Sequence, residues 1–476
     1  MSTTIATADE KLRTRLVAAT VAVAFFIQFL DGTIIATSLP QMAASFGTDA
    51  VSMSSGFTVY MLTAAAFMPL SGWLAERFGA RRVFLASLLI FTLASLACGL
   101  AGSLPAFLAA RTLQGFGAAL MTPVGRLIVI RSATKSEIVQ AIATITWPAL
   151  FAPVIGPLLG SWITTHAGWQ WNFFVNLPLG LVGCLLVVAV VPVDRPGPRV
   201  PFDAFGFVAS AGSLTLLLAG LELFAGRQVP DLAAAGLAVA GLVVGIAACR
   251  HLVASPVPLI DLRVLRVRTF ALSTLGAGTF CRLAVNATPF LLPLLLQVGF
   301  GLSAVETGIL ILVYFLGNLA MKSVTTPLLR RFGFRDILIV NGTAAALCIA
   351  AFAAVTPATP VLLLWALLFL AGATRSLQFT ALATLAFADV DGQARSAASS
   401  LSAILQQLAM VGGIAVAVLA IRLVSALRGE AGAADLATLA DFRAAFLIVA
   451  AIGLAGALRF LSLDHDAGRE VSGHRG

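Results

Sequence analysis

Residues 71–82 read SGWLAERFGARR, and a related stretch, TTPLLRRFGFRD, occurs at residues 325–336. Both contain a leucine, an Arg-Phe-Gly run and a further arginine at matching positions. Each copy follows one long apolar segment and precedes another. The repeat predicts a chain built from two related halves, a design that recurs in membrane transporters, whose substrate site lies near the bilayer midplane at the repeat interface.

The composition excludes an ordinary soluble domain. Of the 476 residues, 59% are hydrophobic and 11% are charged, whereas soluble domains carry roughly 25% charged residues. The net charge of +9 is spread over short segments between apolar runs, and is not gathered on one face or tail as in nucleic-acid-binding proteins. We therefore expect a surrounding lipid bilayer and no nucleic-acid partner. The five cysteines lie inside apolar segments and predict neither a disulfide framework nor a metal site.

Apolar segments of about 20 residues, the length needed to cross a bilayer, recur along the whole chain. We predict fourteen spans, at residues 16–39, 53–74, 83–102, 105–130, 138–163, 173–193, 204–224, 232–253, 269–296, 305–328, 336–356, 359–383, 397–424 and 442–463. The sequence thus predicts an all-α polytopic membrane protein. Its parts are an N-terminal six-helix half (1–193), two additional helices with linkers (194–268) and a C-terminal six-helix half (269–476).

The basic residues predict the orientation of these spans. Between spans, lysines and arginines gather in the segments that share a side with the N-terminus, whereas the opposite segments hold only Arg227, Arg422, Arg428 and Arg443. Cytoplasmic loops carry the excess of Lys and Arg. We therefore expect both termini in the cytoplasm and the protein in the inner (cytoplasmic) membrane.

One acidic residue, Asp31, lies deep within a predicted span, and a basic residue, Arg111, lies at similar depth in the fourth span. Charged groups at such depth are rare and usually face a bundle interior or a cavity. Two interpretations remain open: a fixed ion pair that orders the fold, or a proton-coupling site in which Arg111 tunes the proton affinity of Asp31.

The C-terminal half has basic and amide side chains in its spans but no deep acid. Residues three or four positions apart share a helix face, which groups Arg282 with Asn286, Tyr314 with Asn318 and Lys322, and Arg375 with Gln378. These side chains are the candidate substrate-binding residues, and unpaired interior cations favour an anionic group on the cargo. The alternative is that the cations bind backbone carbonyls or unwound helix ends, especially Lys322 and Arg375.

Several short motifs resemble those of the major facilitator superfamily, in particular its fourteen-span drug/proton antiporter branch. They are LDGTIIATSLP (30–40), GWLAERFGARR (72–82), RTLQGFGAAL (111–120), APVIGPLLGS (152–161) and WQWNFFVNLPLG (169–180). The stretches TFCRLAVNATPFLLPLLLQVGFGLS (279–303), MKS (321–323) and ATRS (373–376) are most similar to a multidrug-resistance subgroup. The resemblance covers essentially the whole chain and implies the major facilitator fold.

The resemblance also implies roles for two of these motifs. A conformational latch would consist of Gly72, Glu76, Arg77, Gly79 and Arg81, with Glu76 in place of the usual aspartate. The antiporter motif of the fifth span would consist of Gly156, Pro157 and Gly160, although Ala152 and Ser161 replace its outer glycines.

We therefore predict a proton-coupled antiporter that exports small molecules such as drugs by alternating access. The chain would need no cofactor beyond the proton as coupling ion, would take a small-molecule substrate and would work as a monomer. The alternative cargo is an organic anion such as a carboxylate, and a passive channel is the remaining alternative. The sequence lacks the Walker A loop of an ATP-driven pump and the H-E-x-x-H motif of a metalloprotease, so no enzyme is expected.

Overall fold

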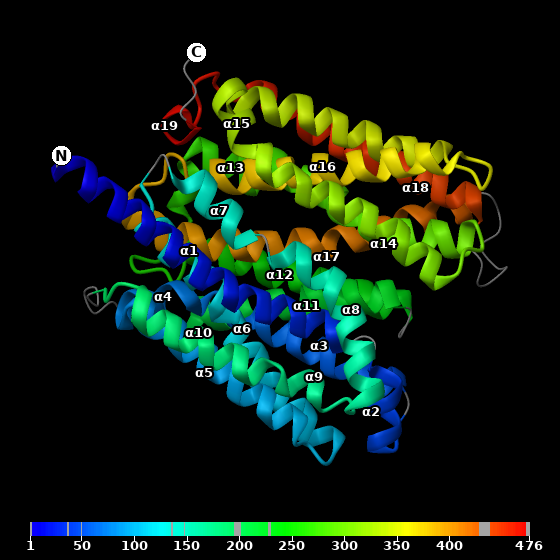
Figure 1. Cartoon of the computed structure of the whole chain (residues 1–476), viewed down its shortest axis with the longest axis horizontal. Coiled ribbons are helices and arrows are strands. Elements are labelled where there is room, and N and C mark those ends of the chain that lie inside the picture. Colours follow the sequence, from blue (N-terminus) through cyan, green and yellow to red (C-terminus); the bar gives the residue numbers. More distant parts are fainter. Residues whose placement is uncertain are drawn as a thin grey trace. The chain divides into compact units, whose positions relative to one another are not determined.

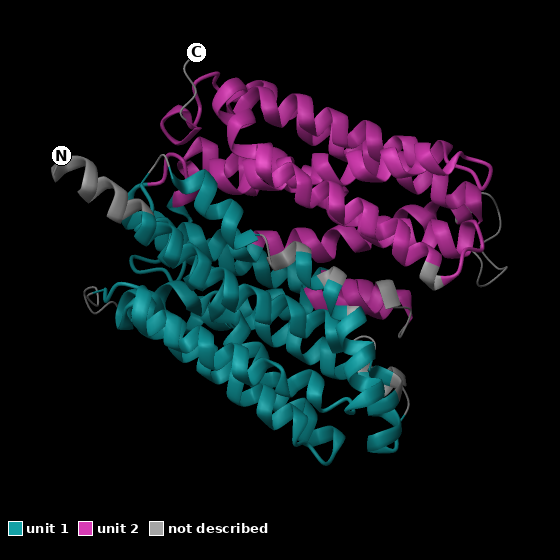
Figure 2. Ribbon diagram, in the orientation of Figure 1, with its two compact units in different colours: residues 1–217, 239–263, 391–404 teal, residues 218–238, 264–390, 405–476 magenta. Residues whose placement is uncertain are grey.

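The computed structural model describes residues 2–35, 38–48, 50–134, 137–146, 148–194, 201–226, 230–427 and 438–472, and long helices dominate these residues (Figure 1). The chain divides into two compact units (Figure 2). Unit 1 contains residues 1–217, 239–263 and 391–404, and unit 2 contains residues 218–238, 264–390 and 405–476. Arg227 and Arg428, which contribute to the predicted orientation, lie outside the described residues.

Ten helices belong wholly to unit 1. They are α1 (Ser2–Ile34), α2 (Leu39–Phe46), α3 (Ala50–Phe67), α4 (Leu70–Phe78), α5 (Ala80–Gly99), α6 (Leu104–Ser132), α7 (Ile138–Thr146), α8 (Pro148–His166), α9 (Trp171–Phe174) and α10 (Asn176–Val190). Helix α6 packs against α1, α3 and α5. Of the residues in its most apolar membrane-length stretch, 83% are buried. Polar side chains on α6 are therefore held in the interior of unit 1.

Unit 2 is built around four long helices. Its helices are α13 (Arg268–Thr274), α14 (Ala277–Leu294), α15 (Ala304–Ala351), α16 (Val361–Leu385), α18 (Leu439–Arg459) and α19 (Arg469–Ser472). Leucine and phenylalanine side chains from α14, α16 and α18, including Leu291, Leu368 and Phe446, form one continuous apolar core. Two prolines, Pro289 and Pro293, precede a short π-helical segment, Leu295–Gly299. Because proline lacks the backbone N–H and disturbs the turn before it, the regular α-helical hydrogen bonding is interrupted here.

Three helices are shared between the units: α11 (Ala204–Gly226), α12 (Asp231–Ala254) and α17 (Arg395–Leu427). Helices α11 and α12 contain the two additional predicted spans. In their most apolar stretches, only 33% of the residues of α11 and 17% of those of α12 are buried. Their apolar surfaces therefore suit contact with lipid.

The two copies of the repeat end their Arg-Phe-Gly run in the same backbone conformation. Gly79 separates α4 from α5 with φ 89°, and Gly333 interrupts α15 with φ 73° and ψ 174°. Glycine adopts a positive φ at little cost, whereas a side chain at the same position would be strained. The repeated glycine thus marks a break in helical direction in each unit.

Eleven helices among the described residues are long and apolar enough to cross a bilayer, or twelve when α3 and α4, which meet at 58°, count as one bent span. This number matches the predicted fourteen spans only in part. The predicted span 53–74 is divided between α3 and α4. The single 48-residue helix α15 contains the predicted span 305–328 and most of the predicted span 336–356.

A carboxylate holds together the segments that flank α11 and α12. Asp203 accepts hydrogen bonds from the backbone N–H groups of Gly206 (2.8 Å) and Leu259 (3.2 Å) and from His251 Nε2 (2.8 Å). Burial raises the pKa of the Asp203 carboxyl, but the hydrogen bonds from Gly206, His251 and Leu259, together with the charge of His251, outweigh it and lower that pKa overall. The ionised carboxylate therefore stabilises this junction.

Candidate functional site

The predicted pair of deep charges exists as a salt bridge in unit 1. Arg111 Nη1 on α6 lies 2.8 Å from Asp31 Oδ2 on α1, and neither side chain is exposed to solvent. Burying two such charges is costly, so the surroundings must satisfy the remaining hydrogen-bonding positions. Side chains from further helices do so for the carboxylate, whereas Arg111 Nη2 has no hydrogen-bond partner among the described residues.

Two amides complete the shell of Asp31. Gln114 Nε2 on α6 and Asn176 Nδ2 on α10 each donate to Asp31 Oδ1 over 2.8 Å. Ser95 on α5 accepts from both amides, at 2.8 Å and 3.2 Å. Five residues from four helices thus form a buried polar network, which we call the Asp31 cluster: Asp31, Ser95, Arg111, Gln114 and Asn176.

Arg111 also has contacts that do not involve the carboxylate. Its Nη1 donates to Gln114 Oε1 (2.5 Å), its Nε donates to the carbonyl of Gly56 (3.1 Å), and its guanidinium lies 4.3 Å from the ring centroid of Tyr60. Cation–π contacts of this kind stabilise a desolvated cation. Arg111 would therefore keep three partners if Asp31 became neutral.

The Asp31 cluster has a definite chemical constraint. Three N–H donors occupy three of the roughly four lone-pair positions of the ionised carboxylate. A proton at Asp31 would remove the negative charge to which these donors, above all Arg111, are attracted, and would weaken the salt bridge.

The antiporter-motif residues lie on α8, against α1. A Cβ built on Gly156 would lie 2.1 Å from Thr33 Oγ1, so only glycine permits this approach of the two helices. Thr33 Oγ1 donates to the carbonyl of Ala152 over 3.0 Å, and the carbonyl of Gly160 accepts from Thr164 over 2.6 Å. Pro157 lies within the helical run of α8, and its side chain is outside the described part.

The predicted latch residues have several different partners. Gly72 faces the Ser396 and Ser400 hydroxyls of α17, and Arg77 lies 5.3 Å from the ring centroid of Trp73. Glu76 lines a cavity of about 200 Å³ beside the start of α17, and within the described residues it has no ion pair shorter than 4.0 Å.

A different acid, Asp194, binds the segment that follows Gly79. Its carboxylate accepts from the N–H groups of Ala80 (2.5 Å) and Arg81 (3.2 Å), and Arg131 lies 3.7 Å away. The Arg81 guanidinium donates to the carbonyl of Val188 over 2.5 Å. Sequence reasoning assigned no role to Asp194, because it lies outside the quoted motifs, just after α10.

Serine hydroxyls join the first turns of α17 to α4 and α6. Ser400 Oγ lies 2.9 Å from Ser71 Oγ, Ser399 donates to the carbonyl of Pro123 (2.6 Å), and Ser402 accepts from Arg126 (3.1 Å). We call these residues of α17 the serine row: Ser396, Ser399, Ser400 and Ser402. The row is buried and was not recognised in the sequence, although RSAASSLS (395–402) is visibly rich in serine.

In unit 2, two of the predicted cations face polar partners between α15 and α16. Arg375 Nη1 donates to Tyr314 Oη over 3.3 Å, and Lys322 Nζ donates to Thr380 Oγ1 over 2.7 Å. Asn318 lies one turn from both Tyr314 and Lys322. It is 1% exposed, and neither of its amide atoms has a hydrogen-bond partner among the described residues.

The other predicted residues of unit 2 are turned elsewhere. Arg282, which is 4% exposed, donates to the carbonyl of Ser273, which the break between α13 and α14 leaves without a helical partner. Gln378 accepts from Asn341 over 2.9 Å, away from Arg375. Asn286 packs beside Gly413 of α17. The i, i+3 pairing of Arg375 with Gln378 therefore does not produce one binding face.

The long apolar helices and the buried charge network are typical of a polytopic membrane protein of the secondary-transporter class. The sequence profile of the Major Facilitator Superfamily matches residues 21–414, and the chain belongs to this family. It is accordingly a transporter and not an enzyme.

Relatives with curated descriptions agree with this assignment. The chain is 34% identical over 397 residues to "Putative multidrug resistance protein MdtD" of Serratia proteamaculans (strain 568), covering 83% of each chain. It is 35% identical over 403 residues to the protein of the same name in Escherichia coli O6:H1, covering 83% of this chain and 84% of the relative. The resemblance to a multidrug-resistance subgroup is thereby confirmed.

Two solved structures share the fold. The crystal structure of the human organic anion transporter MFSD10 (TETRAN) has a TM-score of 0.63 and 17% identity, covering 94% of this chain and 99% of that one. The proton:xylose symporter XylE bound to 6-bromo-6-deoxy-D-glucose has a TM-score of 0.60 and 13% identity, covering 97% of this chain and 98% of that one. At these identities the similarity concerns the fold alone.

Proposed function

We propose that this transporter is a proton-coupled antiporter that exports small molecules such as drugs. The observation that carries the proposal is the Asp31 cluster: a fully buried carboxylate whose two oxygens are bound by three donors from α6 and α10. Buried intramembrane acids of this kind mark ion and proton pathways. The name shared by the relatives supports drugs as cargo.

The coupling step follows from the geometry of Asp31. Proton uptake neutralises the carboxylate and weakens its attraction for Arg111 and the amide donors. Arg111 then rests on Gln114, the carbonyl of Gly56 and the ring of Tyr60, so its charge remains solvated by the protein. Proton release restores the salt bridge. The two charge states of Asp31 thereby favour two arrangements of α1 relative to α6, which is the bistable element that alternating access needs.

The energy available is sufficient for such a cycle. A charge that moves across the membrane gains about 2.3 kcal/mol per 100 mV of potential, and a population shift of tenfold needs about 1.4 kcal/mol. One proton therefore suffices to bias the equilibrium between two conformations that differ by a few kcal/mol.

A second cargo class, organic anions such as carboxylates, is favoured by the chemistry between α15 and α16. Arg375 donates to the Tyr314 hydroxyl and Lys322 donates to the Thr380 hydroxyl. Both atoms of the buried Asn318 amide are without a hydrogen-bond partner among the described residues. A carboxylate would supply negative charge to the cations and an acceptor to the amide. A lipophilic cation would meet repulsion at the same place.

We also propose that the chain crosses the membrane fourteen times. The segment Glu306–Ala354 has 49 residues, more than twice the ~20 that one span needs, and Gly333 breaks it near its middle. Helices α7 and α8 supply a further apolar span across residues 138–166. With the bent pair α3–α4, these bring the eleven candidates to fourteen.

An even number of spans, combined with the distribution of basic residues, supports two cytoplasmic termini in the inner membrane. We also propose the division into residues 1–193, 194–268 and 269–476, with the two additional helices in the middle segment, and a monomeric unit of transport.

Reconstitution into proteoliposomes with an imposed pH gradient tests the coupling. We expect uphill transport by the wild-type protein and none by Asp31→Asn, with Asp231→Asn, an exposed carboxylate, as the matched control. Uphill transport by Asp31→Asn at the wild-type rate would remove Asp31 from the coupling mechanism. Failure of the gradient to drive wild-type transport would favour a passive channel.

The same proteoliposomes test the cargo. Comparison of ethidium-like cations, neutral drugs and aromatic carboxylates discriminates the two classes. Transport of cations without any anion transport would contradict the organic-anion alternative, and the reverse result would contradict cationic drugs as the main cargo.

A further inference from the structure

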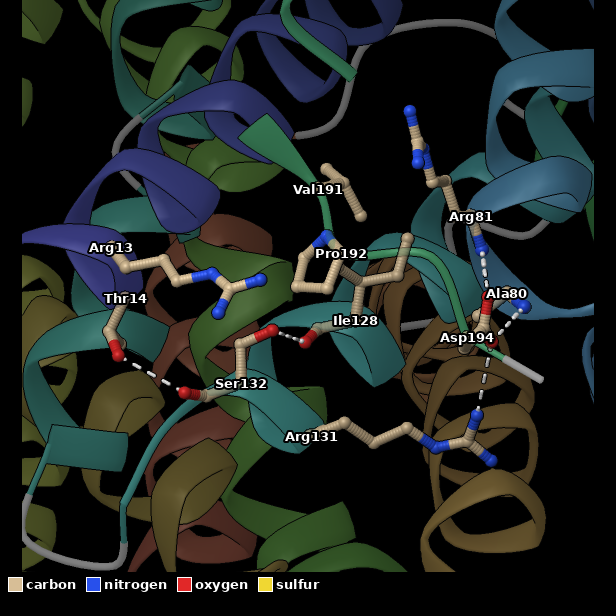
Figure 3. Close-up of a pocket in the computed structure, with 10 residues that line it drawn as sticks. All are labelled: Arg13, Thr14, Ala80, Arg81, Ile128, Arg131, Ser132, Val191, Pro192 and Asp194. Atoms are coloured by element: carbon tan, nitrogen blue, oxygen red, sulfur yellow. Dashed lines mark hydrogen bonds and ion pairs between the residues drawn. The ribbon is translucent and has the colours of Figure 1, made fainter. Parts of the chain in front are cut away.

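A basic cavity lies in unit 1 where four membrane-length helices end (Figure 3). Its volume is about 230 Å³, several times the ~30 Å³ share of one water molecule, and thus large enough for a phosphate group. Its walls come from the start of the α1 span, the start of α5, the end of α6 and the residues after α10. The lining residues include Arg13, Arg81, Arg131, Ser132, Pro192 and Asp194.

The cavity carries excess positive charge, because three arginines and one aspartate line it. Figure 3 shows the Arg13 guanidinium at one end of the cavity, the Arg131 guanidinium turned toward Asp194, and the Arg81 guanidinium pointing away from Asp194. Arg13 is exposed and forms no ion pair within the described part of the chain. Arg13 and Arg131 are thus the two cations available to an anion.

Asp194 does not cancel this charge. Its oxygens accept from the N–H groups of Ala80 and Arg81 at the first turn of α5, where the helix dipole already favours a negative charge. Arg131 lies 3.7 Å from this carboxylate, longer than a charge-assisted hydrogen bond of about 2.7–2.9 Å. Its guanidinium therefore retains donors for a second anion.

The position of the cavity indicates where an anion would come from. The apolar spans of α1 and α5 begin, and those of α6 and α10 end, within a few residues of its walls, so the cavity lies at the level of lipid headgroups. Leu12 (57% exposed) and Val193 (69% exposed), which are neighbours in sequence of lining residues, are exposed apolar side chains. They suit contact with acyl chains.

We propose that this cavity binds a phosphate group, held between Arg13 and Arg131 and supplied by an anionic phospholipid of the surrounding leaflet. Guanidinium groups match phosphate oxygens bidentately, and basic pockets between membrane helices bind lipid head groups. The site is separate from the Asp31 cluster and does not depend on the proposed transport reaction.

Native mass spectrometry of the full-length protein, released from nanodiscs of phosphatidylcholine with or without phosphatidylglycerol, tests the proposal. We expect the double variant Arg13→Gln/Arg131→Gln to retain about thirtyfold less phosphatidylglycerol, because each arginine that binds the anionic head group contributes about 1 kcal/mol and each step of about 1.4 kcal/mol is tenfold. The matched control Arg15→Gln/Arg250→Gln removes two exposed arginines outside the cavity and should retain it as the wild type does. Thermal unfolding in phosphatidylcholine nanodiscs verifies that each variant is folded.

A second arm distinguishes lipid from free phosphate. Calorimetric titration of the detergent-solubilised protein with inorganic phosphate would show binding that the double variant lacks if the phosphate group alone is recognised, and this result would identify a soluble source. Retention of phosphatidylglycerol only, lost in the double variant, would identify the lipid as the source. Equal phosphatidylglycerol retention by the wild type and the double variant, with no phosphate binding by either, would overturn the proposal.

Discussion

At the scale of single residues, the Asp31–Arg111 pair admits both a structural and a coupling interpretation, and one pair of variants separates them. Arg111→Gln leaves a buried carboxylate without its cation, which typically costs about 3–5 kcal/mol. Adding Asp31→Asn removes the unpaired charge, so we expect most of the lost thermal stability to return while gradient-driven transport stays absent. Thermal unfolding in detergent and proteoliposome transport measure the two effects. Recovery of both by the double variant would show that the pair is only structural.

Asn318 and Gln378 provide a second contrast between two buried amides. A buried amide without partners costs roughly 1–3 kcal/mol, so Asn318→Leu should raise the unfolding temperature yet reduce transport if this amide serves the cargo. Gln378 is bonded to Asn341 and to the carbonyl of Leu338, so Gln378→Leu should lower the unfolding temperature. If Asn318→Leu is stabilised and transports normally, Asn318 has no contact with the cargo.

At the scale of helices, α15 and α16 approach so closely that glycine is required between them. A Cβ on Gly372 would lie 1.8 Å from the carbonyl oxygen of Tyr314, whereas a Cβ on Gly308 of α15 would meet nothing within 4 Å. We expect Gly372→Ala to destabilise the protein by about 1–3 kcal/mol or more, as overpacking does. Gly308→Ala should leave stability unchanged or raise it by about 0.5–1 kcal/mol. Unfolding temperatures of the two variants check this difference.

Sequence reasoning recovered the helices and the central pair because both depend on local patterns. Apolar length located the spans, and equal depth brought Asp31 together with Arg111. Gln114 could also have been predicted from the sequence, since it lies three residues after Arg111 and shares its helix face. Ser95 and Asn176 could not, because their contacts with Asp31 depend on how α5 and α10 are rotated about their axes, which no local sequence pattern determines.

The unit 2 residues show the opposite limitation. Arg282 was among the candidate ligands because it lies within an apolar segment that contains no deep acid. The break after Thr274 instead exposes the carbonyl of Ser273 close to its guanidinium. Helix breaks of this kind are weakly encoded, and glycine at 276 and 278 was the only local signal.

At the scale of the whole molecule, the Asp203 junction predicts a pH dependence of stability. The folded state lowers the pKa of Asp203, so the folded protein releases this proton more readily than the unfolded chain. The resulting stabilisation is present above the unfolded pKa of about 3.9 and is lost as the pH falls through the lower, folded value. We expect Asp203→Asn to be less stable than the wild type at pH 6 and to lose less stability between pH 5 and pH 3. Parallel loss by both proteins over that range would contradict this assignment.

The serine row has a consequence for how easily its helices separate. A hydroxyl–hydroxyl contact such as Ser71–Ser400 contributes only about 0.5–1.5 kcal/mol net, and water replaces either partner without leaving a charge or an apolar surface behind. A row of leucines would expose apolar surface to water when the helices separate, and a row of ion pairs would leave charged side chains without partners. The seam at the serine row is buried when closed and costs little to open. It therefore has the properties of a reusable seal, in which the arrival and departure of a few water molecules accompany each opening.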